Sequence, residues 1–461
     1  MASILSILGV ARDAMLAQTA GLDVTGQNIA NVSTPGYVRR RAILEARSNR
    51  GGPEGGVYFR GIQRTFDRFA QARVVSESGL RGAARARAGA LSALQSIVAP
   101  DGGPNIGDRV NALFGAFNQL ALKPDDPTAR AAVLAKADDL AAAFHDTAAQ
   151  LGNAKGELFQ SAVATGGEIN ERLTEIAELN QKIGEATAQG DPAADLRDQR
   201  DKLIGEVGDR MQVQAVEDAS GKMTLLSSGS VLVEGDQASS VQVGLAQSGA
   251  LQISIARPGG AVVDVTAKVT SGTLGGLREA RDVDLPALQQ NLDQLAYDLA
   301  GAVNGVHAAG VGLDGVGGRP LFAPPAAVQG AAYGFAVDPS VAGQPSHLAA
   351  AKTAANLPGG NDVALQLAQL AGQPLGAGGT PSERFASLCG ELGAEQLGAE
   401  QDLALRDGTV AQAEALRDSA SGVSLDEEMV ELTRYQRAFE ASMKVLRTAD
   451  ELLAGLIRDL G

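Results

Sequence analysis

Apolar residues recur at alternating steps of four and three residues at both ends of this 461-residue chain. The first such stretch runs from Ile4 to Val32 and the last from Leu425 to Leu460, and each has only two polar residues in its seam. This spacing predicts two long helices, each with a coiled-coil-like stripe. Neither helix can bury such a stripe alone, so both ends of the chain need partners.

Local signals set the bounds of these helices. Thr34-Pro35 disfavours helix before the proline, and Pro35-Gly36 suits the central positions of a type II turn, so we expect the first helix to end near Asn31. Gly36 then takes a positive φ. Ser424 followed by Glu427 is a capping-box pattern, which predicts that the last helix begins at Leu425.

Two interpretations of the stripes are open: they line an ordinary helical core, or the termini pair with each other and with copies of themselves in an assembly. The second interpretation makes the large stripe residues a candidate assembly interface. In the first helix they are Ile4, Leu8, Met15, Leu22 and Ile29, and in the last they are Leu425, Met429, Leu432, Phe439, Leu446, Leu453 and Ile457.

Charge is distributed unevenly along the chain. Lys plus Arg number 39 and Asp plus Glu 54, a formal charge of −15 that disfavours nucleic acid or an anionic membrane as partner. The segment 38–87 is nevertheless rich in arginine, whereas acidic residues outnumber basic ones from Glu391 onward. The two ends therefore complement each other, although each charged residue alone could simply belong to a solvated face.

The middle of the chain changes period. Helical patterns cover about 82–98, 106–121, 128–153, 157–188 and 193–207, and the last contains opposite charges at helical neighbour spacing in Asp195–Lys202. Alternating strands then fill 211–269, which predicts a small antiparallel sandwich or barrel. Helix returns at 286–306, loops occupy 309–381, and helix resumes at Ser382.

The fold class expected is mainly α with an inserted β domain, in three domains. Residues 1–70 with 423–461 form a terminal coiled-coil domain, 71–208 with 275–422 form a helical bundle or rod, and 209–274 form an outer β domain.

The sequence predicts no active site. His145, His307 and His347 are isolated, Cys389 lies alone in a helical stretch, and we expect no metal and no cofactor. Gly310–Gly315 matches GxGxxG without the strand and helix that dinucleotide binding needs, which favours a flexible loop. No apolar run is long enough for a membrane span, and the N-terminus lacks the features of a usual secretory signal.

One motif is specific. Asn28, Asn31, Thr34, Pro35, Gly36 and Tyr37, within the run from Asn28 to Tyr37 after the first helix, resemble the signature of the bacterial flagellar axial proteins of rod, hook and hook-associated type. The C-terminal run from Ser424 to Leu446 resembles the matching helix of that superfamily. The segments 195–203, 303–322 and 360–365 resemble its first hook-associated members, which join hook to filament.

The resemblance implies a structural subunit rather than an enzyme. It would be secreted through the flagellar type III export apparatus without a cleaved signal and would form a ring between hook and filament. The partners it implies are further copies of the chain, the hook protein, the second hook-associated protein and an export chaperone that holds the C-terminal helix. The alternatives are a distal rod or hook protein, or a secreted enzyme or adhesin with flagellar-type ends.

Overall fold

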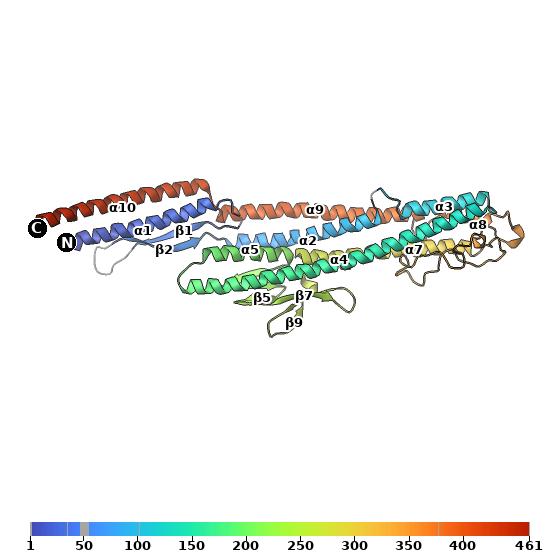
Figure 1. Ribbon diagram of the computed structural model, residues 1–461, viewed down its shortest axis with the longest axis horizontal. Helices are drawn as coiled ribbons and strands as arrows, with labels where there is room; N and C mark the ends of the chain where they lie inside the picture. The colour runs from blue at the N-terminus through green and yellow to red at the C-terminus, as the bar shows by residue number, and fades with distance from the viewer. Residues whose placement is uncertain (1, 35, 47–54, 101, 377, 461) are drawn as a thin grey trace.

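The computed structural model is a long rod with both chain termini at one end (Figure 1). It describes residues 2–34, 36–46, 55–100, 102–376 and 378–460. Its long helices are α1 Ala2–Ala30, α2 Arg68–Val98, α3 Ile106–Leu122, α4 Pro127–Ala188, α5 Ala194–Arg210, α7 Leu285–His307, α9 Pro381–Ser421 and α10 Leu425–Leu460. The short helices are α6 Gly272–Glu279 and α8 Asp362–Gln369, with a π-helical segment at Ala280–Asp284 and 3-10 turns at Thr266–Lys268, Pro345–His347, Ala354–Asn356 and Leu370–Gly372.

Helices α1 and α10 lie side by side at the terminal end of the rod (Figure 1). A bulged antiparallel hairpin, β1 Arg40–Ala46 and β2 Val57–Arg64, packs against α1. The pairing of the termini is confirmed, and both helices keep the expected bounds. The hairpin itself was not predicted from the sequence.

A bundle of α2, α3, α4, α7 and α9 forms the shaft. Its largest apolar core includes Leu91, Phe114, Phe117, Leu140 and Phe144, all buried. The predicted break between 153 and 157 is wrong, because α4 runs without interruption for 62 residues and buries apolar side chains on both sides of that point.

Helix α2 begins at Arg68, whereas its predicted start was Gly82. The glycines that weaken the helical pattern are needed for close packing against α5. A Cβ on Gly82 would lie 2.0 Å from the carbonyl oxygen of Asp209, and one on Gly79 would lie 2.9 Å from that of Gly208. Tertiary packing therefore overrides the low helix propensity of these residues.

The expected β module is confirmed as two small antiparallel sheets. One has the strand order β3-β4-β5-β6 and the other β7-β8-β9. The strands are β3 Gln214–Glu217, β4 Met223–Ser227, β5 Ser230–Glu234, β6 Gln237–Ala238, β7 Ser240–Leu245, β8 Leu251–Ala256 and β9 Val262–Asp264. A second apolar core joins both sheets to α4, α5 and α6, and the three-domain division remains a prediction.

The segment between α7 and α9 folds around the far end of the shaft. The buried Arg130 of α4 holds it there, since its Nη1 donates to the Leu348 carbonyl at 2.6 Å. The prediction of a flexible loop at Gly310–Gly315 is not supported. Val311 is bridged to Gly317 and Ala351, and a Cβ on Gly310 would meet Val363 at 2.8 Å.

Candidate functional site: the terminal helix pair and its joint

Helices α1 and α10 touch through small or flat side chains. The buried residues of α1 are Ala11, Ala17, Gly21, Val24, Thr25 and Asn28. Ala11 and Thr25 lie in the predicted seam, whereas Ala17, Gly21 and Val24 form a stripe beside it. The ring of Tyr435 packs directly against Gly21, since a Cβ on Gly21 would lie 2.5 Å from that ring. The sequence reasoning followed large residues and missed Ala17, Gly21 and Val24, although small residues at heptad spacing were the available signal.

The predicted assembly residues flank this contact. In α1, Ile4, Leu8, Met15, Leu22 and Ile29 are half-buried. In α10, Leu432, Phe439, Leu446 and Leu453 are half-buried, while Leu425, Met429 and Ile457 are exposed by 48%, 55% and 64%. Pairing of the two helices thus leaves much of the apolar surface uncovered, and the role of these residues in assembly stays a prediction.

The motif after α1 forms a joint around Asn28. The buried Asn28 amide makes four hydrogen bonds: it accepts from the Arg40 amide at 3.0 Å and the Tyr37 hydroxyl at 2.9 Å, and donates to the Arg40 carbonyl at 2.8 Å and Glu428 at 2.9 Å. All donors and acceptors of the side chain are used. Asn28 therefore ties α1, the hairpin and α10 together.

The turn that follows has the expected geometry. Gly36 has a φ of +83°, as predicted, and the Tyr37 amide donates to the Thr34 carbonyl at 3.2 Å. Asn31 supports the turn by accepting from the Thr34 hydroxyl at 3.1 Å. Pro35 lies outside the described residues.

Arginines of the hairpin region connect the joint to two acidic helices. Arg39 pairs with Glu427 and with Glu428, the latter at 2.7 Å, so the predicted complementarity of the chain ends is confirmed at this point. Arg40 pairs with Asp195 and, at 3.0 Å, with Asp198 of α5. Because α10 and α5 belong to different parts of the rod, these two adjacent arginines fix the terminal pair to the shaft.

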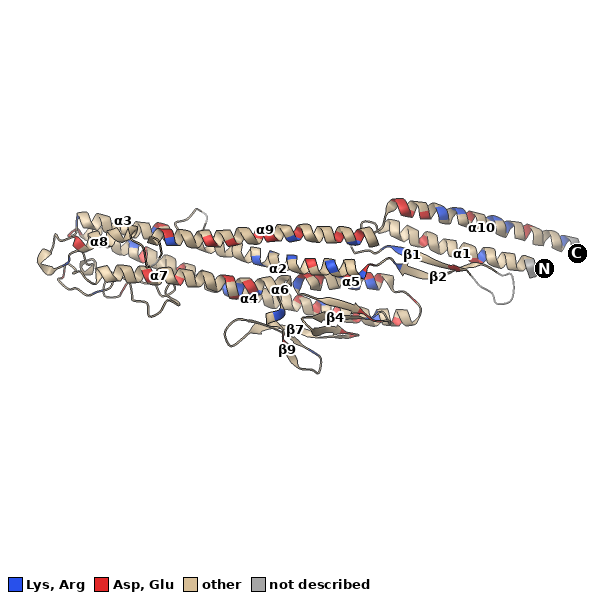
Figure 2. Cartoon of the chain, turned by 180° about the vertical axis from the view of Figure 1, so that it is seen from behind, with Lys and Arg blue, Asp and Glu red and all other residues tan. Residues whose placement is uncertain are grey.

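The acidic face of α5 was misinterpreted from the sequence. Asp195, Asp198 and Asp201 recur every three residues and face the hairpin, where Arg64 pairs with Asp198 at 2.6 Å and with Asp201 at 2.7 Å. These carboxylates pair across elements and not with helical neighbours. Figure 2 shows acidic and basic residues gathered where α5 meets the hairpin.

Burial controls the titration of this cluster. Burial raises the pKa of Asp198, and this effect is larger than the opposite effect of Arg64 and Arg40. Burial also raises the pKa of Asp201. Burial lowers the pKa of Arg40, but hydrogen bonds to Asp195 and Asp198 outweigh this, so that its net pKa is raised. Apart from Asp195, whose side chain is 79% exposed, the cluster is a buried structural network in which each charge depends on its partner.

The described residues contain no group of three or more His, Cys, Asp or Glu that could hold a metal ion. Each histidine has its own backbone partners: His307 is buried between the Arg319 carbonyl and the Ala349 amide, while His145 and His347 bond other carbonyls. Burial raises the pKa of the Cys389 thiol, which fits a packing role. Among the described helices, none is long and apolar enough to cross a membrane.

The ends of the chain match two families of flagellar proteins. Residues 8–37 match the flagella basal body rod protein family, and residues 415–458 match the C-terminal family of the flagellar basal body rod FlgEFG proteins. These segments contain most of the terminal helix pair and the motif that follows α1. The helix pair and its joint therefore define an axial protein of the bacterial flagellum.

The shaft identifies the family. Residues 91–322, half of the chain, match the helical domain of flagellar hook-associated protein FlgK. The chain belongs to this family of flagellar structural proteins, as the resemblance implied. The match decides against a rod or hook protein.

Individual relatives agree with the family. Flagellar hook-associated protein 1 of Bacillus subtilis is 26% identical over 98% of both chains. The protein of the same name from Salmonella typhimurium is 28% identical over 69% of this chain and 59% of its own length. The flagellar hook junction protein FlgK from Burkholderia pseudomallei has the same fold, with a TM-score of 0.66, 16% identity, and coverage of 76% of this chain and 100% of its own.

Proposed function

We propose that this chain is the structural subunit that joins the flagellar hook to the filament, and that copies of it form a ring through their terminal helices. Family membership supports the location, and one observation supports the mode of assembly. The α1–α10 pair exposes apolar side chains that no described part of the chain covers, including Leu16 at 63% and Leu452 at 58%. Apolar patches of this kind mark contacts with other proteins.

The exposed residues of α10 lie on both flanks of its contact with α1. Leu425, Met429, Met443 and Ile457 form one flank, and Val445, Leu452 and Leu456 form the other. The remaining face is mainly polar, with Thr433, Arg437, Glu440 and Lys444, and the exposed Val430 lies at its edge. Helix α10 can therefore contact α1 and two further apolar helices at once, as a subunit in the interior of a tube must.

The joint supplies the rigidity that such a ring needs. The buried contacts of Asn28, Arg39 and Arg40 hold the helix pair at one angle to the shaft. A fixed angle lets every copy present the same flanks to its neighbours, which is the condition for a closed ring. The function proposed is mechanical and needs no catalysis or cofactor.

The proposed partners follow from the same surface. In the flagellum, the ring contacts the hook protein on one side and the second hook-associated protein on the other. Before assembly, an export chaperone covers the apolar flanks of α10, and the chain leaves through the flagellar type III export apparatus. The exposure of these flanks in a single chain supports such a requirement for shielding.

The test uses the source bacterium with its own copy of this gene deleted. Deletion should leave hooks without filaments, and the wild-type gene should restore the filaments. Hooks that stay bare after the wild-type gene is returned would contradict the proposed function. Met443→Asp, on an apolar flank, should leave hooks bare and flagellin in the medium. Thr433→Asp, on the polar face of the same helix, is the matched control and should build filaments.

A further inference from the structure

Each of the two small sheets has one covered edge and one open edge. Strands β6 and β7 lie against α4, and the Asn170 amide of α4 accepts from the Val241 amide at 2.7 Å and donates to its carbonyl at 2.9 Å. The chain therefore protects the polar groups of these edges. Strands β3 and β9 form the opposite edges, and all of their residues are exposed.

The open edges carry valines where edge strands usually carry protecting residues. Val216 of β3 is 58% exposed, and Val262 and Val263 of β9 are 58% and 43% exposed. Neither strand contains a lysine or a proline, the residues that commonly prevent strands from pairing between molecules. Each strand is short and carries one acidic residue, Glu217 on β3 and Asp264 on β9, so any added strand has to suit that charge.

The register defines which backbone groups are available. The Asp218 amide donates to the Lys222 carbonyl, so the alternation of an antiparallel ladder turns the N–H and C=O groups of Ala215 and Glu217 away from β4. On β9, the Val265 amide donates to the Ile253 carbonyl. The same alternation therefore turns the N–H and C=O groups of Val262 and Asp264 away from β8. Both strands thus present two outward residues at the same spacing.

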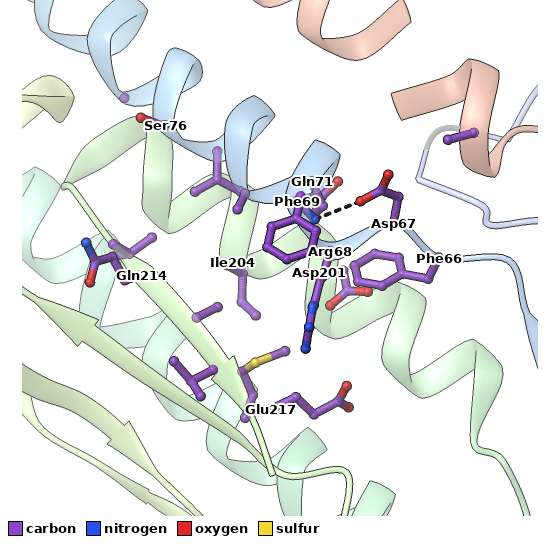
Figure 3. A pocket seen from close by; sticks show the side chains of 18 of the residues that line it. Phe66, Asp67, Arg68, Phe69, Gln71, Ser76, Asp201, Ile204, Gln214 and Glu217 are labelled. Atoms are coloured by element: carbon purple, nitrogen blue, oxygen red, sulfur yellow. Dashed lines mark hydrogen bonds between the residues drawn. The ribbon is translucent and has the colours of Figure 1, made fainter. Parts of the chain in front are cut away.

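A cleft provides room beside β3. It has a volume of about 1230 Å³ and separates β3 from the first turns of α2. Figure 3 shows Gln214 and Glu217 on the strand, with Phe66, Phe69 and Ile204 among the side chains around the space. An added strand would lie between the backbone of β3 and these apolar side chains.

We propose that β9 of one copy of this chain adds to β3 of the next copy, in the antiparallel direction, so that the β modules of the ring form continuous sheets. This interaction surface rests on the proposed ring. In this register Ala215 pairs with Asp264 and Glu217 with Val262, while Val216 faces Val263. The parallel arrangement would set Glu217 directly opposite Asp264, and like charges at opposed positions are unfavourable.

Charge also favours β9 as the occupant. In the cleft, Asp201 and Glu217 are already paired with arginines of their own chain, whereas Arg41 and Arg68 on the other wall are exposed. The acidic end of β9 at Asp264 suits this wall. Because β3 and β9 are different surfaces, the contact is head to tail, a geometry that closes into a ring when the rotation between successive copies adds up to a full turn.

Disulfide crosslinking tests the register. Val216 and Val263 would form a non-hydrogen-bonded pair, with Cα atoms roughly 4.5 Å apart, a separation that a disulfide spans. Hook–filament junctions isolated from cells with Cys389→Ala, Val216→Cys and Val263→Cys should give a ladder of linked subunits on mild oxidation. Pairing Val216→Cys with Val262→Cys, whose side chain points to the other face, is the control and should link much less.

The outcomes separate this inference from the proposed function. Filament-bearing junctions in which Val216→Cys and Val263→Cys do not link would overturn the β3–β9 contact and leave the junction role intact. If the cysteine chain builds no filaments, a second pair of variants decides. Ala215→Pro and Val262→Pro each remove an outward N–H and no ladder bond within the chain, so they should reduce filament number at least tenfold with an intact β module by hydrogen exchange. Normal filaments from both would equally overturn it.

Discussion

The terminal helix pair and the far end of the shaft use apolar side chains in opposite ways. At the far end, Phe144, Phe322 and Phe335 are buried together, with neighbouring ring centroids 4.7 and 4.5 Å apart. At the terminal end, large residues such as Leu16 and Ile457 remain exposed while small ones are buried. The shaft thus has an extensive apolar core within one chain, whereas the terminal pair leaves most of its large apolar side chains half-buried or exposed.

The largest expected effect is on the terminal pair. Leu432→Asp places a carboxylate at the half-buried contact of α10 and should cost several kcal/mol wherever that surface is desolvated. We expect cells to secrete flagellin without building filaments, while thermal unfolding of the monomeric shaft is unchanged. Phe439→Asp should behave alike. A normal number of filaments with Leu432→Asp would show that the terminal stripe is dispensable, and would contradict the contrast drawn between the terminal pair and the shaft.

The reciprocal change belongs in the shaft. Phe117 is fully buried, and Phe117→Ala should lower the free energy of unfolding by about 3–5 kcal/mol. Chemical denaturation of the monomer measures this. Leu8→Ala in the half-buried terminal helix should shift the same transition by less than about 1 kcal/mol. Its matched variant is Leu113→Ala, which removes the same side chain from the buried core and should cost about 2–5 kcal/mol. Equal shifts would show that the termini already belong to the monomer's cooperative core.

A smaller effect is expected at the turn after α1. Gly36 has a positive φ with open space around its Cα, so Gly36→Val introduces backbone strain alone, on the order of 1–3 kcal/mol. A free monomer can relieve that strain by loosening the terminal helix, but a packed ring cannot. We expect unchanged melting of the shaft and fewer filaments by electron microscopy. If Gly36→Val cells had as many filaments as the wild type, the motif would do no more than end the first helix.

The smallest effect is a pH dependence confined to the shaft. His307 is buried, and burial lowers its pKa. As a neutral ring it accepts from the Ala349 amide at 3.0 Å, and protonation would turn that acceptor into a donor. The unfolded chain binds the proton more readily, so this contribution is complete above pH of about 6.5 and is lost as pH falls, by up to about 1.4 kcal/mol per pH unit.

Denaturation of the wild type and of His307→Gln at pH 7 and pH 5 measures this difference. We expect the variant to be less stable at pH 7 and to lose less stability on acidification. A parallel loss in both proteins would assign the pH dependence to other groups, but not to Asp198 and Asp201. Their raised pKa values act in the opposite direction, because they favour the folded state at low pH and this contribution is lost as pH rises.

What the sequence determined by itself was local. The period of apolar residues placed α1 and α10 to within a residue or two, the Pro-Gly pair predicted the positive φ of Gly36, and alternation located the strands of the β module. These features depend on neighbouring residues and on backbone sterics, which the sequence states directly.

Only the tertiary structure decided which surfaces meet. Gly21 and Gly82 are buried because another backbone or ring approaches them, and no local pattern distinguishes such a glycine from a helix breaker. The partners of Arg40 and Arg64 lie more than a hundred residues away in α5, where Coulomb attraction follows from proximity in space. Residue types and periods set the elements, but the choice among many possible charged partners and apolar faces needed the packed chain.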